Sequence, residues 1–290
     1  MISIIITAYN VAEYIEQSIN SALNQTYDDI EVIVVLDKPT DNTTEIVKSI
    51  NNPKLRIIEN KENVGAGMSR RIGIEYSKGE FISFLDGDDW LEPNFLVHLI
   101  SSQKETNADI TCSGVIYRKL NGICETTKYI NLVSEGYNKF INFCNQRIVG
   151  CTCKLIKKSL FDKVQYCGRR YIEDLPTMLK LIHYANKLVF IDKAEYNIRQ
   201  NKNSLTNSAN YIKEFIYQAL CYLDVIEFFN KVDPKVYEYT NFNNYKLLVL
   251  QQLNEHEFTM EEIQPYITDW IEFTIRFFNL NKFNNDKAIK

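Results

Sequence analysis

The sequence predicts an α/β fold, in which a mostly parallel, twisted sheet lies between helices and is followed by a helical carboxyl-terminal extension. Three observations lead to this prediction. Short β-branched runs alternate with helical patterns through about the first hundred residues, as in strand–helix–strand units. The chain has 290 residues, of which 45% are hydrophobic, so it can bury a substantial core. From about Asn210 onward the hydrophobic spacing is that of helices alone.

The first part of the chain contains strands and helices in strict alternation. The predicted strands are short apolar runs, which indicates burial on both faces of the sheet. The predicted helices have apolar residues at helical spacing, and Thr40 or Asp41 is placed to cap the second of them. In chain order the elements are a strand at 2–7, a helix at 13–24, a strand at 31–36, a helix at 44–50, a strand at 55–59, a helix at 66–76 and a strand at 80–85.

The middle of the chain is less regular. Strand-like patterns at 110–117 and 188–191 flank a helical pattern at 174–184. The pattern therefore divides the chain into an alternating part up to about residue 108, a mixed part from 109 and a helical extension from about Asn210.

Composition and charge argue against several classes of protein. The net charge of −4 provides no broad basic surface, so we expect no nucleic-acid partner. No basic segment precedes the apolar start, and no apolar run reaches the roughly 18 residues of a membrane span, so we expect a cytoplasmic protein. The seven cysteines form no CxxC pair, which argues against a disulfide framework or a zinc site. The histidines lack metal-ligand spacing; they are His98, His183 and His256.

Polar residues follow each of the predicted strands of the first half. Because the carboxyl ends of parallel strands lie along one edge of a sheet, these residues should meet where ligands bind. Tyr9 can stack on a nucleobase, Asp37 can accept a hydrogen bond from the base or ribose, and Asp88 can hold a hard cation beside a diphosphate. The segments are Thr7-Ala8-Tyr9-Asn10, Asp37, Asn63-Val64-Gly65 and Asp86-Gly87-Asp88-Asp89.

These segments, in this order, resemble the motifs of family 2 glycosyltransferases of the GT-A fold. The resemblance covers about residues 1–207 and is specific because the motifs occur together in the family's order. It implies a catalytic domain over 1–207 and leaves 208–290 as a helical carboxyl-terminal extension. The matching stretches are TAYNVAEYIEQSINSALNQTYDDIEVIVV, NVGAGMSRRIGIEYSKGEFISFLDGDDW, EDLPTMLKLI and YNIRQNKNSLT.

The resemblance implies inverting, metal-dependent transfer of a sugar from a nucleotide-sugar donor, a UDP-sugar, to an acceptor hydroxyl. Residues 1–108 would bind the donor, and residues 109–207 would bind a glycan, lipid-linked or protein-linked acceptor of polysaccharide, glycolipid or glycoprotein synthesis. Asp174, with Glu173 beside it, matches the catalytic base, and Asp88 with Asp86 matches the ligands of Mn²⁺ or Mg²⁺. The positions that match nucleotide-sugar contacts are Thr7, Ala8, Tyr9, Asp37, Gly65, Arg70, Asp86, Gly87 and Asp88.

Several positions depart from the family pattern. The family commonly has two acids followed by Gly-Ser after the second strand, whereas this chain has Leu36-Asp37-Lys38-Pro39, which leaves the donor nucleotide less defined. Arg71 stands where the family often has Asn. The predicted carboxyl-terminal helices carry many aromatic residues. These either pack in a core or form a face that contacts a partner or the inner surface of the membrane.

Simpler interpretations exist for each motif. The acids at 86–89 and 173–174 are also typical of turns and of helix N-termini, Asp37 could serve a turn alone, and Tyr9 could be a core aromatic. A nucleotidyltransferase would need a glycine-rich loop after the first strand, where TAYNVAEY has no glycine, and the Gly65 to Gly67 segment lacks the third glycine of a dinucleotide fingerprint. The functional alternative is a module that binds a nucleotide sugar without turnover.

Overall fold

The computed structural model describes residues 1–145, 150–168, 173–201 and 211–239, together with 264, 268–269, 271–273 and 275–276. The chain divides into two compact units, Met1–Ser204 and Leu205–Lys290. The first unit contains a ten-stranded sheet and the helices that cover it, and the second unit is helical where it is described.

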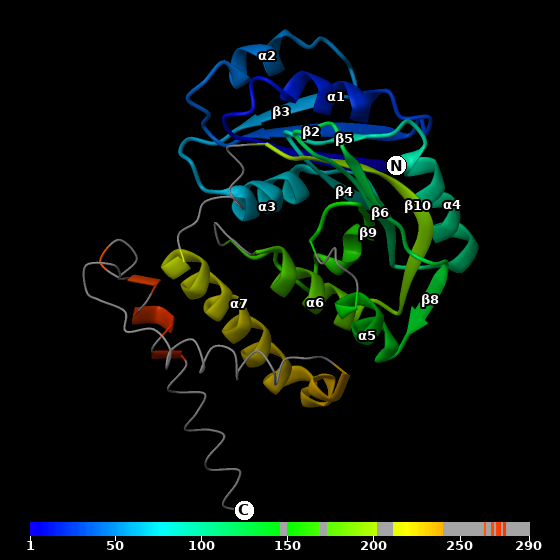
Figure 1. The fold of residues 1–290 in the computed structure, drawn as a ribbon, viewed down its shortest axis with the longest axis vertical. Coiled ribbons are helices and arrows are strands. Elements are labelled where there is room, and N and C mark those ends of the chain that lie inside the picture. Colours follow the sequence, from blue (N-terminus) through cyan, green and yellow to red (C-terminus); the bar gives the residue numbers. More distant parts are fainter. Residues whose placement is uncertain are drawn as a thin grey trace, which may run out of the picture. The chain divides into compact units, whose positions relative to one another are not determined.

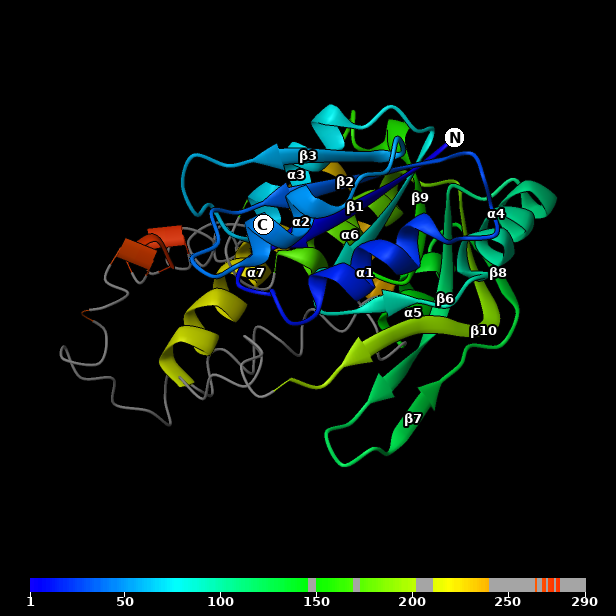
Figure 2. The same ribbon diagram turned by 90° about the horizontal axis from the view of Figure 1, so that it is seen from above.

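The first half of the sheet is wholly parallel. Its strands lie in the order β3-β2-β1-β4, so the chain adds strands on one side of β1 and then returns to add β4 on the other. Helices α1 and α2 cover one face and α3 the opposite face (Figures 1 and 2), as right-handed crossovers require when the direction reverses. The elements are β1 (Ile2–Ala8), α1 (Ile15–Leu23), β2 (Ile30–Leu36), α2 (Thr43–Ser49), β3 (Leu55–Glu59), α3 (Ala66–Tyr76) and β4 (Phe81–Asp86).

The second half of the sheet is mixed, so the expectation of a mostly parallel sheet holds for the first half only. Strands β6 and β10 are parallel neighbours, but the other pairings in this half are antiparallel. The β6–β7 pair is antiparallel because the turn at 119–123 joins these two strands directly, whereas a parallel pair needs a crossover of about a dozen residues. The elements are β5 (Trp90–Leu91), α4 (Phe95–Thr106), β6 (Ile110–Arg118), β7 (Cys124–Thr127), β8 (Leu132–Glu135), α5 (Asn138–Cys144), β9 (Lys154–Lys157), η1 (Lys158–Leu160), α6 (Asp174–Tyr184) and β10 (Lys187–Arg199).

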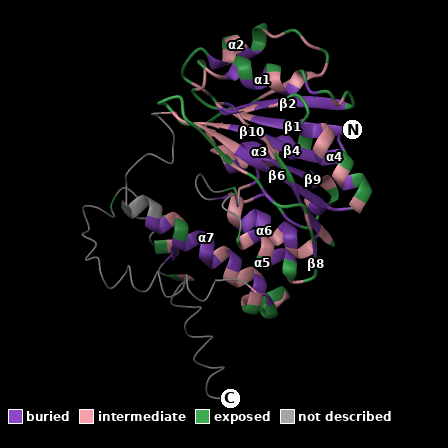
Figure 3. Ribbon diagram, turned by 45° about the vertical axis from the view of Figure 1, so that its right-hand side comes forward, coloured by how far each residue is buried: buried purple, intermediate pink, exposed green. Residues whose placement is uncertain are grey.

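The core lies on both faces of the central strands. Every residue of β2 is buried, and Figure 3 shows the inner strands buried while the outer faces of α1, α2 and α4 are exposed. The predicted helix over 66–76 begins and ends as expected. Helix α2 starts after Asn42, and Asp41 accepts the backbone N–H of Thr43 at 3.0 Å, so Asp41 supplies the side-chain bond that a cap would provide.

The second unit contains α7 (Tyr211–Val232) and the short helix η3 (Pro234–Tyr239). Arg276 binds the carboxylates of Asp224, Glu227 and Glu272 at 2.7–2.8 Å. The aromatic residues Phe229 and Phe273 are buried, which favours the core interpretation for them. Three other aromatic residues of the carboxyl-terminal region lie outside the described residues; they are Trp270, Phe277 and Phe278. Among described residues, no helix is both long and apolar enough to cross a membrane.

Candidate active site

The ends of the parallel strands meet at one edge of the sheet, as predicted. Thr7 of β1 is level with Asp86 of β4, and Ala8 is level with Leu36 of β2. The N–H of Asp37 donates to the carbonyl of Ala8 at 2.9 Å. The register of the strands therefore places Tyr9, Asp37 and the acidic loop (residues 86–89) along this one edge.

Asp37 is buried and holds the loop that leads into α3. Its carboxylate accepts hydrogen bonds from Asn60 Nδ2 at 2.9 Å, from the N–H of Val64 at 2.9 Å and from the N–H of Gly65 at 2.8 Å. Gly65 has φ of +87° and ψ of 166°, a conformation that is essentially open to glycine alone. Asp37 therefore orders this turn, as the simpler interpretation expected. Its contact with a nucleoside stays a prediction.

Tyr9 is 46% exposed, so the alternative that it is a core aromatic is wrong. It is followed by Asn10, whose φ of +52° is in the left-handed region, and Lys38 at the neighbouring strand end has φ of +53°. Asn10 Oδ1 accepts the N–H of Thr40 at 2.7 Å, which ties together the loops after β1 and β2. An exposed ring on an ordered loop is free to stack on a ligand.

The acidic loop packs tightly against the end of β1. A Cβ atom on Gly87 would lie 2.8 Å from the carbonyl oxygen of Thr7, so a larger residue would push the loop away. The N–H of Asp86 donates to the hydroxyl of the buried Tyr196 at 3.1 Å. Asn201 Nδ2 donates to Asp88 Oδ2 at 3.1 Å, and the N–H of Arg199 donates to Asp89 Oδ1 at 2.8 Å. The end of β10 thus holds the acidic loop in place.

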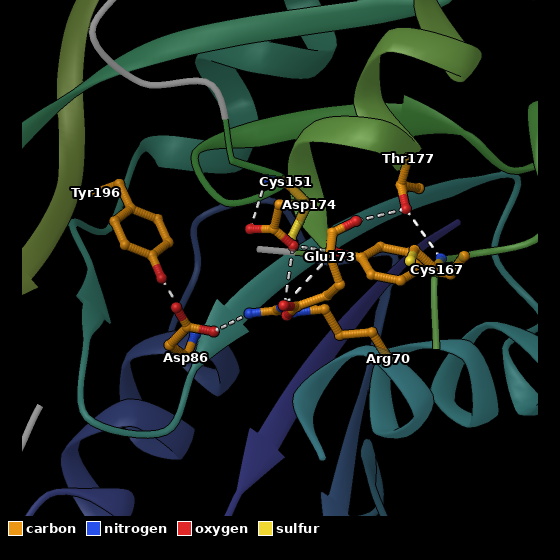
Figure 4. A network of polar contacts seen from close by, with 9 residues as sticks. Arg70, Asp86, Cys151, Cys167, Glu173, Asp174, Thr177 and Tyr196 are labelled. Atoms are coloured by element: carbon orange, nitrogen blue, oxygen red, sulfur yellow. Dashed lines mark hydrogen bonds and ion pairs between the residues drawn. The ribbon is translucent and has the colours of Figure 1, made fainter. Parts of the chain in front are cut away.

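Arg70 of α3 joins the acids of two distant motifs. Its Nη2 lies 2.7 Å from Asp86 Oδ1, and its Nη1 lies 2.6 Å from Glu173 Oε1 and 2.9 Å from Asp174 Oδ1. Figure 4 shows these carboxylates converging on the guanidinium, with Asp86 on one side and the start of α6 on the other. A guanidinium suits this position because its planar fork can bond several carboxylates at once.

Asp174 makes the most hydrogen bonds among the acids around Arg70. It accepts hydrogen bonds from the Tyr166 hydroxyl and, at 3.2 Å, from the N–H of Cys151. Burial by itself would raise the pKa of Asp174, but Arg70 and the hydrogen bonds from Tyr166 and Cys151 outweigh burial and lower the pKa. Asp174 is therefore ionised at neutral pH, and its side chain is 25% exposed.

Glu173 behaves in the opposite way. Burial, and then the charge of Asp174, raise its pKa to about 7, and Arg70 only partly opposes them. Its side chain is 9% exposed, so it has much less access to a ligand than Asp174. The two neighbouring acids consequently differ in protonation state near neutral pH, a pattern that is common in active sites.

The acidic loop has the chemistry of a cation site. Burial and then the charge of Asp86 raise the pKa of Asp88, and burial with the charges of Asp86 and Asp88 raises the pKa of Asp89 well above its usual range. Crowded carboxylates of this kind fit a hard divalent cation, which would relieve their repulsion. Within the described part of the chain, however, no three His, Cys, Asp or Glu side chains are grouped to hold a metal alone.

Sequence reasoning missed several residues of the site. Arg70 was expected to line the donor, and its link to Asp174, over 104 positions, was not foreseen. Tyr166 and Cys151 have no motif that distinguishes them. Arg199 and Asn201 were visible in YNIRQNKNSLT, but no contact could be assigned to them from the sequence.

Similarity to known proteins identifies the family. The Glycosyl transferase family 2 pattern matches residues 3–165. The chain is 26% identical to the glycosyltransferase GlyG of Streptococcus pneumoniae serotype 4, over 98% of this chain and 96% of GlyG. It is 27% identical to an Escherichia coli enzyme, the UDP-Glc:alpha-D-GlcNAc-diphosphoundecaprenol beta-1,3-glucosyltransferase WfaP, over 76% of this chain and 84% of WfaP.

Solved structures agree at the level of the fold. The crystal structure of S. aureus TarS 1–349 superposes with a TM-score of 0.70 at 20% identity, covering 95% of this chain and 79% of that chain. The same protein in complex with UDP-GlcNAc gives a TM-score of 0.65. The GT-A fold predicted from the motifs is thereby confirmed. Because the family pattern spans more than half of the sequence, the chain belongs to glycosyl transferase family 2 and is a glycosyltransferase.

Proposed function

We propose that the enzyme transfers a sugar from a UDP-sugar to an acceptor hydroxyl with inversion, using a divalent cation at Asp88 and Asp86 and Asp174 as the base. The observation that carries the proposal is the convergence of Asp86 and Asp174 on Arg70. This contact brings the acidic loop at the donor edge and the acids of α6 into one site. The complexes of TarS with UDP and UDP-GlcNAc support a uridine nucleotide as the donor.

The donor side of the site is the sheet edge. Tyr9 is exposed for stacking on the base, and the ordered loop at Gly65 lines the same edge. Asp88 and Asp86 would hold Mn²⁺ or Mg²⁺, with further ligands from the donor's phosphates and from water. When bound, the cation would supply positive charge against the charge that develops on the leaving diphosphate.

The acceptor side of the site is the N-terminus of α6. The acceptor oxygen would form a bond to the anomeric carbon while the bond from that carbon to the diphosphate oxygen breaks on the opposite face. The acceptor proton would pass to the Asp174 carboxylate, which is ionised and partly exposed. Glu173 is too buried for this contact, so we assign it a supporting part in the charge balance around Arg70. The acceptor itself would be a glycan, lipid-linked or protein-linked.

A donor panel tests the proposal. Wild type, Asp88→Asn and Asp174→Asn are incubated with UDP- and GDP-sugars and Mn²⁺, and nucleotide release is measured with and without EDTA. We expect wild type to hydrolyse one UDP-sugar slowly, Asp88→Asn to lose at least about 100-fold, and EDTA to abolish the activity.

Matched variants separate the roles of the acids. Glu75→Gln changes an exposed acid on α3 and should retain wild-type turnover. Turnover that survives in Asp174→Asn would overturn its role as base, and turnover in EDTA would overturn the cation. A wild-type enzyme that binds UDP but turns over none of the donors, with any acceptor class, would indicate the binding module.

A further inference from the structure

The carboxyl end of β10 and the residues just after it contact three acids of the acidic loop, although more than a hundred positions separate them in sequence. Tyr196 accepts the N–H of Asp86, and Asn201 donates to the carboxylate of Asp88. Arg199 makes the largest set of these contacts, and it does so with both its backbone and its side chain.

The guanidinium of Arg199 is held by two hydrogen bonds and contacts two aromatic rings. Its Nε donates to the carbonyl oxygen of Asp88 at 2.9 Å, and its Nη2 donates to Gln17 Oε1 at 2.6 Å. Its Cζ lies 4.7 Å from the ring centroid of Tyr14 and 4.6 Å from that of Trp90. The guanidinium thus lies over an aromatic ring of the loop before α1 and over the ring that follows the acidic loop.

This arrangement holds the backbone of Asp88 in place. The carbonyl of Asp88 cannot rotate without losing a charge-assisted hydrogen bond from a guanidinium that also contacts two rings. Two residues along the chain, Asn201 Nδ2 donates to Asp88 Oδ2 at 3.1 Å, so the backbone and the carboxylate of Asp88 are held from the same segment. Partners that orient ligands in this way typically contribute 10–100-fold to metal affinity.

We propose that Arg199 is a positioning residue that orients Asp88 to bind the divalent cation of the donor complex. This inference rests on the proposed function, because it assumes a cation at Asp88. Arg199 acts through the backbone of Asp88, since its side chain donates to the carbonyl oxygen and not to the carboxylate, whose Oδ2 accepts from Asn201. The bond from the Arg199 N–H to Asp89 belongs to the backbone and is retained in side-chain variants.

Direct Mn²⁺ binding tests the inference. Free Mn²⁺ is measured by electron paramagnetic resonance during titration of MnCl₂ into the full chain with saturating UDP. We expect Arg199→Met to raise the Mn²⁺ dissociation constant about 10–100-fold. Arg199→Lys should stay impaired, because a lysine keeps the charge but lacks the planar fork that stacks and donates at once. At saturating Mn²⁺, the donor KM and the kcat of Arg199→Met should return close to the wild-type values, because the defect is in cation binding.

Arg118→Met is the matched control. Its guanidinium also lies over Trp90, at 5.7 Å, but it donates to Asn197 Oδ1 at 2.8 Å, outside the acidic loop. We expect its Mn²⁺ affinity to stay within about 2-fold of wild type. Equal losses in Arg118→Met and Arg199→Met, or wild-type affinity in Arg199→Met, would overturn the positioning role.

Two further outcomes are decisive. If Arg199→Met does not fold, Arg199→Lys and Gln17→Ala replace it, since Gln17 is exposed and anchors the same guanidinium; wild-type affinity in both overturns the inference. If wild type binds no Mn²⁺ in the presence of UDP, the proposed function is refuted at its cation. That result is obtained with wild type alone and is therefore distinct from a failure of the Arg199 inference.

Discussion

Replacing Arg70 by methionine should destabilise the protein strongly, and the loss should shrink at acidic pH. The side chain is buried between the carboxylates of Asp86, Glu173 and Asp174, and methionine removes the charge while filling similar space. Removing one partner of a buried ion pair typically costs about 3–5 kcal/mol, because the remaining charge is left without compensation.

The three carboxylates contribute unequally to this loss. Asp86 is 35% exposed and can be rehydrated, so its share is small. Glu173 has a pKa of about 7 even with Arg70 present, so it would take up a proton at little cost. Asp174 would then account for most of the loss, which we place at about 3 kcal/mol at pH 7.5. Because burial would raise the pKa of Asp174 once Arg70 is absent, protonation near pH 5 should recover part of the loss.

Urea unfolding followed by circular dichroism at pH 7.5 and pH 5 measures the effect. Arg71→Met is the control, because Arg71 lies next to Arg70 on α3 and pairs with the exposed Glu75 at 3.2 Å. We expect that control to lose less than about 0.5 kcal/mol. Equal losses in the two variants, or a loss in Arg70→Met that is the same at both pH values, would refute the argument that Arg70 compensates buried acids.

Three further predictions follow from the site's geometry. The pKa of Glu173 is raised from 4.5 to about 7, so wild type should lose stability as the pH rises through this window. The stability of Glu173→Gln relative to wild type should therefore increase by about 2 kcal/mol between pH 5 and pH 8 in urea or thermal unfolding. Parallel pH curves for the two proteins would contradict this. Gly65→Ala should cost about 1–3 kcal/mol in urea unfolding, because alanine is strained at φ of +87°; an unchanged midpoint would show that the loop adapts. Gly87→Ala should cost about 1–3 kcal/mol and raise the donor KM, because its Cβ would meet the Thr7 carbonyl at 2.8 Å, and wild-type values for both would refute the tight fit.

The sheet edge could be predicted because the signals for it are local. Each strand of the first half is a continuous apolar run, and parallel strands with helical crossovers have their carboxyl ends on the same side. Asp37 and Asp86 therefore had to lie at one edge before any contact was known, and the register of β1 with β2 and β4 confirms it. The predicted bounds of α3 and α6 were also correct, since both have clear helical spacing.

The second half of the sheet could not be predicted in the same way, because its strands pair with partners that are distant in the sequence. Strand β10 runs over Lys187–Arg199, but only 188–191 was predicted, since Asp192 and Lys193 interrupt the apolar run. The pairing of β10 with β6 shifts register between Phe190 and Ala194, and that irregularity carries the strand past the interruption. The continuation of β10 is what delivers its last residues to the acidic loop, so the missed strand and the missed contacts have one cause.

The balance of charge in the site is the physical basis of the proposed divalent cation. Asp86 and Asp174 share Arg70, whereas the charge of the Asp88 carboxylate is disfavoured by burial and by Asp86. A diphosphate entering alone would add negative charge to this surplus, and a divalent cation would reverse the sign of the interaction. We therefore expect UDP to bind Asp88→Asn more tightly than wild type in EDTA, and wild type more tightly than Asp88→Asn in Mn²⁺. Calorimetric titration measures both orders, and the same order under both conditions would show that Asp88 does not act through a cation.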